Sequence, residues 1–153
     1  MALCICEFEL VPDGDGNVLC WPFWPGRSDG TFGTDDNDAI VMSADWLREM
    51  ALDGLMKDGR TPNLPLGNVP VRGGRVVAVA VDVSLSDIPA VTAKEAAGLL
   101  GVSDARVSQL CRNGHLDSWK VGRTRMVSID SVQARLADER KAGRPRKLSA
   151  SVS

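Results

Sequence analysis

The chain has 153 residues, of which 44% are hydrophobic and 25% are charged, which predicts one or two small folded domains and excludes wholesale disorder. The longest aliphatic run, at 76–81, is too short for a membrane span, and the N-terminus lacks the basic start of a signal peptide, so we expect a cytoplasmic protein. The net charge of −2 is unevenly divided: residues 1–88 carry six basic and fourteen acidic side chains, and residues 89–153 carry twelve basic and six acidic ones.

The uneven charge predicts two domains with different partners, of which the basic one suits phosphate groups. The cysteines form no Cys-x-x-Cys pair, and the single histidine, His115, has no second ligand near it in the sequence. A structural zinc site needs four such ligands at short spacings. We therefore expect free thiols, no metal and no other cofactor.

The first half begins with strand patterns and then changes period. Residues 2–10 alternate, the Asp- and Gly-rich segment 13–17 is a turn, and residues 18–21 complete a hairpin. A third short strand is expected at 31–33, a helix at 37–58, a Pro- and Gly-rich loop at 60–74, and a last strand at 75–84. The apolar stripe of the helix comprises Ile40, Ala44, Leu47, Ala51 and Leu55. The predicted order of elements is thus β-β-β-α-β.

The acidic residues of this half stand in predicted turns or at the start of the helix, which explains Asp13, Asp15, Asp35, Asp36 and Asp38. Metal-dependent cleavage of a phosphodiester needs several carboxylates that converge on one or two metal ions, and the pattern offers no such set. We therefore expect no catalytic residue and no enzyme, with a nuclease kept as an alternative.

Aromatic side chains cluster after the second strand, at Trp21, Phe23 and Trp24. Such side chains are enriched among the residues that dominate binding energy in protein interfaces. They also fill cores and cover open sheet edges, so both interpretations stay open. If the cluster binds a protein, these three rings are the candidate contacts.

The first half resembles the HicB-type antitoxins. The resemblance rests on the element order, on Pro22, Pro25, Gly26 and Gly33, and on the acidic residues before Ala39. A closing valine strand that ends at 82–84 also fits. The resemblance implies a partial ribonuclease-H-like domain over 1–88 that binds and masks a HicA-type toxin, a small ribonuclease that cleaves mRNA.

The second half begins with two short helices. Thr92 and Glu95 have the spacing of a capping box, and Gly101 ends the first helix. Ser103 caps a second helix at 104–113, so the pair reads as a helix-turn-helix. Residues 116–128 predict a β-hairpin, in which Trp119, Val121 and Val127 pack inward, and Asp130 and Ser131 are expected to cap a third helix.

The outward side chains of the second helix and of the hairpin suit DNA. Arginine pairs with guanine, glutamine pairs with adenine, and a basic hairpin suits phosphates or the minor groove. The candidate DNA-binding residues are Arg106, Ser108, Gln109, Arg112, Lys120, Arg123 and Arg125.

The strings at 92–103, 114–116 and 120–125 resemble the excisionase/MerR-like winged helix family over residues 90–137. The resemblance implies binding of double-stranded DNA, with Arg106, Ser108 and Gln109 on the recognition helix. It also implies that the basic hairpin is the wing. Asp104 departs from the usual start of that helix, so no base preference carries over.

The whole sequence is therefore predicted to be an α+β protein with a toxin-binding domain at 1–88, a winged helix-turn-helix at 89–140 and a flexible basic tail at 141–153. The expected function is that of an antitoxin that masks its toxin and represses its own operon. A homodimer or a higher even oligomer is expected, because paired half-sites need two readers. The alternative is an excisionase-like or stand-alone transcriptional regulator whose acidic domain only oligomerises.

Overall fold

The computed structural model describes the backbone of residues 2–152 and the side chains of residues 2–140. The chain divides into two compact units, Met1–Asp87 and Ile88–Ser153. Both units combine helices with antiparallel sheet, so the α+β class is confirmed. The ribonuclease-H-like assignment of the first unit stays a prediction.

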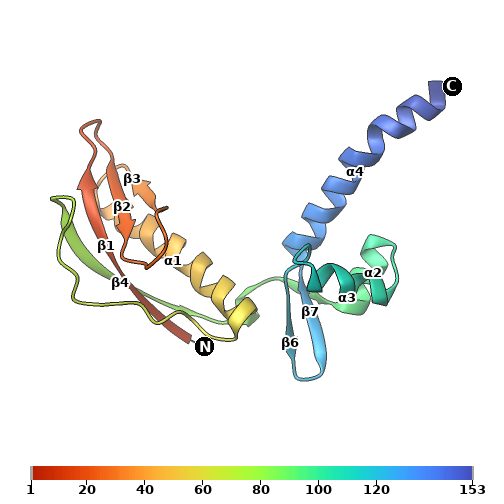
Figure 1. The fold of residues 1–153 in the computed structure, drawn as a ribbon, viewed down its shortest axis with the longest axis horizontal. Helices are drawn as coiled ribbons and strands as arrows, with labels where there is room; N and C mark the ends of the chain where they lie inside the picture. The colour runs from red at the N-terminus through yellow and green to blue at the C-terminus, as the bar shows by residue number, and fades with distance from the viewer. Residues whose placement is uncertain (1, 153) are drawn as a thin grey trace. The chain divides into compact units, whose positions relative to one another are not determined.

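The first unit contains the predicted β-β-β-α-β order. Its elements are β1 (Ala2–Pro12), β2 (Val18–Pro22), β3 (Thr31–Gly33), α1 (Asp36–Asp58) and β4 (Arg75–Val83). The strands form one antiparallel sheet in the order β3-β2-β1-β4. Helix α1 lies along one face of this sheet, and the loop 60–74 lies along the other (Figure 1). A short 3₁₀ turn, Leu85–Asp87, ends the unit.

Helix α1 begins at Asp36, one residue before the predicted start, and ends at Asp58 as predicted. The side chain of Asp35 accepts the N–H of Asp38 at 2.7 Å, and Gly59 ends the helix with φ 73°. The apolar stripe is wrong at its start, because Ile40 is 37% exposed whereas Ala39 is buried. Ser43 is buried as well, because its hydroxyl donates to the carbonyl of Ala39 and needs no water.

The core of the first unit lies between α1 and the sheet. It contains the predicted face of β1, Cys20 of β2 and the odd-numbered valines of β4, from Val77 to Val83. Phe8 is fully buried and meets Trp46 of α1 edge-on, with ring centroids 5.7 Å apart. Burial raises the pKa of the Cys4 and Cys20 thiols and raises that of Cys6 to about 12, so these thiols are protonated at neutral pH.

The second unit is built from short elements. They are β5 (Ala90–Thr92), α2 (Ala93–Leu100), α3 (Asp104–Arg112), β6 (Ser118–Val121), β7 (Thr124–Ser128) and α4 (Ile129–Val152). The strands form a sheet in the order β5-β7-β6, and the core joins α2, α3, the hairpin and the start of α4. The sequence analysis missed β5, a strand of only three residues.

The buried face of α2 is formed by Ala96, Ala97 and Leu100, and Leu99 is 55% exposed. Two predictions for this unit are wrong in detail. Val121 is 60% exposed although it shares a face with the buried Trp119, since it is the last residue of β6 and lies beside the turn. Helix α4 begins at Ile129, and Ser128 rather than Asp130 or Ser131 supplies the cap, because its hydroxyl accepts the N–H of Ser131.

Helix α4 extends through the segment that the sequence predicts as a flexible basic tail. The side chains of residues 141–152 lie outside the described part of the chain. The flexibility of this segment stays a prediction.

Candidate DNA-binding surface

Local capping interactions fix the start of α3 and both ends of α2, the helix before it. The capping box of α2 is present, with Thr92 and Glu95 bonded reciprocally, and Gly101 ends α2 with φ 67°. The Ser103 side chain then accepts the N–H of Arg106 at 3.1 Å. Only the three residues 101–103 separate the helices. This short turn positions α3 against α2 as in a helix-turn-helix.

Helix α3 has one buried and one exposed face. Val107 and Leu110 are buried against α2 and the hairpin. The exposed face carries every residue that the sequence predicts for this helix to read DNA, namely Arg106, Ser108, Gln109 and Arg112. A guanidinium nitrogen of Arg106 donates to the amide oxygen of Gln109 at 2.7 Å. In the free protein the two candidate base readers are therefore hydrogen-bonded to each other.

The hairpin β6–β7 forms the predicted wing. Lys120 and Arg125 are opposite one another in the strand register, so they share a face, and Arg123 lies exposed in the turn at Gly122. Arg125 is only half-exposed, and its guanidinium donates to the hydroxyl of Ser118 at 3.0 Å. The wing thus presents two exposed cations and a third, half-exposed one that is hydrogen-bonded to Ser118.

A polar network ties the wing to α4. The N–H of Asp117 donates to the hydroxyl of Ser131 at 3.2 Å, and the N–H of Ser128 donates to the carbonyl of Asp117 at 2.9 Å. Trp119 of β6 is buried, at 7% exposed. The sequence analysis missed the serine network, although two serines around a predicted helix start are a signal for it. These contacts fix the direction in which the wing projects.

The cations of this surface are not neutralised by nearby acids. Among the described side chains, the ion pairs of the second unit comprise only Arg135 with Glu139, at 3.4 Å. The arginines and the lysine of α3 and the wing have no carboxylate within salt-bridge distance in that part of the chain. Unpaired surface cations attract a phosphate backbone and release its counterions on binding.

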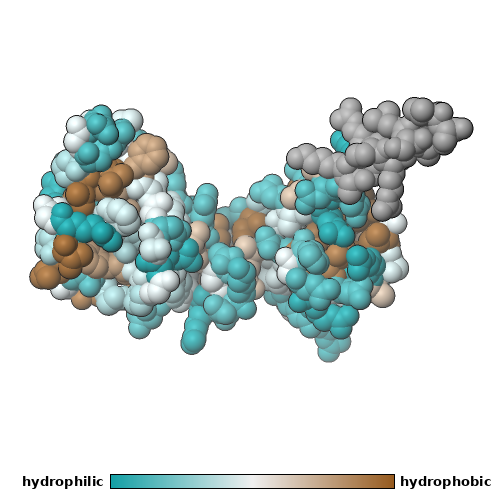
Figure 2. Space-filling model, turned by 45° about the horizontal axis from the view of Figure 1, so that its top comes forward, coloured by the Kyte–Doolittle hydropathy of each residue, from teal (hydrophilic) through white to brown (hydrophobic). Residues whose placement is uncertain are grey.

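The two units differ in their surfaces as well as in their charge. Large apolar side chains are exposed mainly on the first unit: Leu3, Phe32, Ile40, Val41, Met42, Leu66, Val69 and Val71. The second unit exposes Leu99 and Val121. Figure 2 shows this contrast, with several brown patches on the first unit and mostly teal on the second.

The structure does not bring the predicted toxin-binding aromatics together on one surface. Trp21 lies opposite Glu9 on the outer face of the sheet, with the guanidinium of Arg72 stacked 3.9 Å from its ring centroid. Trp24 packs against the core on the α1 side and meets Trp46 edge-on at 5.6 Å. Phe23 is half-buried between them. Any single partner surface therefore reaches part of this set.

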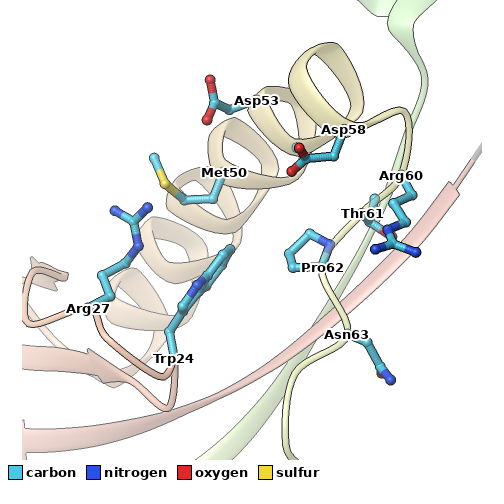
Figure 3. Close-up of a pocket in the computed structure, with 10 residues that line it drawn as sticks. Trp24, Arg27, Met50, Asp53, Asp58, Arg60, Thr61, Pro62 and Asn63 are labelled. Atoms are coloured by element: carbon cyan, nitrogen blue, oxygen red, sulfur yellow. The ribbon is translucent and has the colours of Figure 1, made fainter.

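A cavity of about 570 Å³ lies beside Trp24, between the C-terminal half of α1 and the loop (Figure 3). Asp53 and Asp58 line it from α1, and Arg27 and Arg60 line it from the loops. Asp53 also pairs with Lys57 at 3.0 Å. The lining is therefore mixed in charge and has a single aromatic wall.

The acids on the outer face of β1 were missed by the sequence analysis. Glu9 is fully buried, and its carboxylate accepts backbone N–H groups of Val71, Arg72 and Gly74 at 2.8–3.1 Å. Glu7 holds Asn68 in the same way. Burial opposes the charge of Glu9, but these donors outweigh it and hold the pKa of Glu9 below its usual value.

Among the acids that the sequence assigns to turns and caps, Asp13, Asp35 and Asp38 accept backbone N–H groups. Asp13 accepts the N–H groups of Asp15 and Asn17, and Asp38 accepts the N–H of Thr34. Asp36 pairs with Arg75 at 3.1 Å. Within the described residues, no group of three or more His, Cys, Asp or Glu side chains is placed to hold a metal ion.

Comparison with known proteins bears on the second unit. Residues 90–140 match the helix-turn-helix domain family. No curated protein and no solved structure matches the chain. In the described part of the chain, no helix is both long and apolar enough to cross a membrane. The match leaves the HicB resemblance of residues 1–88 as a prediction, and it identifies the second unit as a helix-turn-helix domain of the kind that binds DNA in transcription regulation.

Proposed function

We propose that this chain is a cytoplasmic antitoxin that represses its own operon and masks a HicA-type ribonuclease. The observation that carries the DNA-binding part is the exposed face of α3 beside a basic wing. On this face Arg106 and Arg112, which have no carboxylate partner among the described side chains, flank Gln109. The proposal needs no cofactor and no chemistry, so we propose a binding protein and not an enzyme.

On operator DNA, the N-terminal half of α3 enters the major groove. Arg106 and Gln109 exchange their mutual hydrogen bond for bonds to base edges, and Ser108 lies beside them. Arg112, at the end of α3, and the three wing cations contact phosphates. Two such units on a two-fold related pair of half-sites give the affinity that one small module lacks.

The toxin-binding part rests on the first unit. Its element order and the resemblance of residues 1–88 to HicB support it, and its excess of acidic side chains suits a basic ribonuclease. Trp24 and the mixed-charge cavity beside it offer the aromatic contact, and Trp21 offers a second one on the other face. Phe23, which is half-buried, is the third candidate contact.

Co-expression with a candidate toxin tests this proposal; the candidate to look for is a small basic protein encoded beside this gene. The full chain and residues 1–88 should both restore growth, and only the full chain should repress a reporter behind the operon promoter. The substitution Trp24→Ala should weaken rescue, whereas Leu66→Ala, at a site that is 57% exposed, should leave it unchanged. Rescue by residues 89–153, or by no form of the chain, would move the assignment to the regulator whose acidic unit only oligomerises.

A further inference from the structure

The sheet of the first unit has one protected edge and one open edge. At the β3 edge the strand has three residues, and the backbone of Gly33 lies directly against that of Ala39 in α1. At the other edge, β4 has nine residues. A long edge strand presents a row of backbone donors and acceptors that a further strand can bind.

The register shows which groups of β4 face the open edge. The N–H of Phe23 donates to the carbonyl of Glu7, so the odd-numbered residues of β1 direct their backbone groups toward β2. The even-numbered ones therefore face β4, where Cys6 pairs with Val79 and Phe8 with Val77. The intervening residues of β4 direct their N–H and C=O groups outward, and in the described residues no backbone partner meets them: Val76, Ala78, Ala80 and Asp82.

This edge lacks the devices that usually prevent strand pairing. Such devices are prolines, lysines, bulges and inward-pointing charges. Strand β4 has none of them, and its two charged residues, Arg75 and Asp82, lie at its ends. The outward residues between them include Ala78 and Ala80, which are small enough to let another strand approach. Strand β4 is therefore open to hydrogen bonding with another strand along this edge.

We propose that β4 pairs antiparallel with β4 of a second copy of this chain. The two-fold axis of this dimer passes midway between the two Val79 residues. Ala78 then lies opposite Ala80 of the second copy, and Val76 lies opposite Asp82. In this register all four outward residues form hydrogen-bonded pairs at once. A shift by two residues in either direction leaves an outward residue of each strand without a β4 partner.

The side chains are compatible with this register. On the core face, Val77 meets Val81 of the second copy and Val79 meets its own equivalent, which are favourable β-branched pairs. Arg75 meets Val83, so no like charges face each other. The axis is perpendicular to the sheet, so both copies of α1 lie on one face of a continuous sheet. This dimer stands apart from the toxin assignment, and it supplies the pair of DNA readers.

Substitution at Ala80 tests the dimer in the full chain by sedimentation velocity. Because the Ala80 N–H points outward, Ala80→Pro removes no hydrogen bond within the unit. The double variant Ala78→Lys/Ala80→Lys places like charges opposite one another across the interface. Both should raise the dimer dissociation constant at least about tenfold, whereas Val69→Lys, at an exposed apolar site in the loop, should not. Circular dichroism checks that each variant is folded.

Cysteine cross-linking tests the register. In a Cys111→Ser background the remaining thiols are buried, so an oxidant acts on the introduced ones. A mixture of Ala78→Cys and Ala80→Cys chains should cross-link more than either chain alone, since positions 78 and 80 lie about 5.5 Å apart between Cα atoms in this pairing. A wild-type chain that stays monomeric at about 100 µM, or a dimer that both edge variants leave intact, overturns the proposal. Failure of DNA binding with an intact dimer would count against the proposed function alone.

Discussion

The two units of this chain use the same building blocks in opposite ways. In the second unit, short capped helices and a hairpin hold charged side chains out toward solvent, and only a few apolar residues form the core. In the first unit, the acidic side chains of β1 bind the chain itself, and the Glu9 carboxylate accepts hydrogen bonds from backbone amides of the loop 60–74. The comparison shows why a binding surface can be assigned to the second unit from its free side chains, whereas the first offers its backbone edge and apolar patches.

Core truncations should separate the two units most strongly. Phe8→Ala should cost the first unit about 3–5 kcal/mol, and Leu110→Ala should cost the second about 2–5 kcal/mol, because both side chains are almost fully buried. Thermal unfolding of the full chain, followed by Trp fluorescence, should show one transition lowered in each variant. Binding to a single DNA half-site should survive Phe8→Ala and fail in Leu110→Ala. A single transition that both substitutions lower equally would show that the units are not independent.

Removal of the wing cations should be the next largest effect. The triple variant Lys120→Ala/Arg123→Ala/Arg125→Ala should weaken duplex binding at every sequence and reduce the slope of log affinity against log salt by about 3. The matched control removes three cations of the first unit, Arg48, Lys57 and Arg60. Equal losses in both triples would mean that the charge of the whole chain, and not the wing, attracts DNA.

The two arginines of α3 should behave differently. Arg106→Ala, near the start of the helix, should relax base preference at a cost of about 1–3 kcal/mol on the best sequence. Arg112→Ala, in the last turn, should weaken all sequences alike. The Arg106→Ala and Gln109→Ala changes should be non-additive, because the side chains contact each other at 2.7 Å. Selection from a random duplex pool measures the base preference of each variant. A preference that only Arg112→Ala alters would reverse the roles assigned to the two arginines.

The smallest expected effect concerns Glu9. Its pKa is lower in the folded chain than in the unfolded one, so its ionised form stabilises the loop at neutral pH, and that contribution is lost as the pH falls through the folded value. Glu9→Gln should flatten this acid dependence and speed hydrogen exchange at Val71 and Arg72. DNA binding should not change. Retention of the full acid dependence in Glu9→Gln would assign it to another carboxylate.

Much of the second unit could be predicted because its signals are local. The capping box at Thr92 and Glu95, the turn at Gly101 and the cap at Ser103 each depend on residues within one helical turn. The prediction that Val121 is buried was wrong because it, too, used only a local pattern. Alternation along a strand says which face a side chain shares, but not where the core beneath it ends.

The first unit was harder to predict, because its decisive contacts join residues that are distant in sequence. The amides that bind Glu9 lie 62 to 65 residues away, and backbone donors leave no mark on the identity of the residues that carry them. The sequence was sufficient, however, to predict that Trp21 and Trp24 lie on different faces of the sheet. Cys20 faces the core, so its strand neighbour Trp21 must face away, and the two tryptophans were not candidates for one patch.

The central claim, that α3 and the wing form the DNA-reading surface, is tested most directly by an NMR titration of the full chain. A duplex of about 20 base pairs at low salt is sufficient, because the phosphate contacts do not depend on sequence. The account predicts shifts for the amides of Asp104–Arg112 and of residues 120–125, with the amides of the first unit unmoved apart from effects of slower tumbling. Shifts concentrated in the first unit, or on α2 with α3 and the wing unchanged, would contradict it.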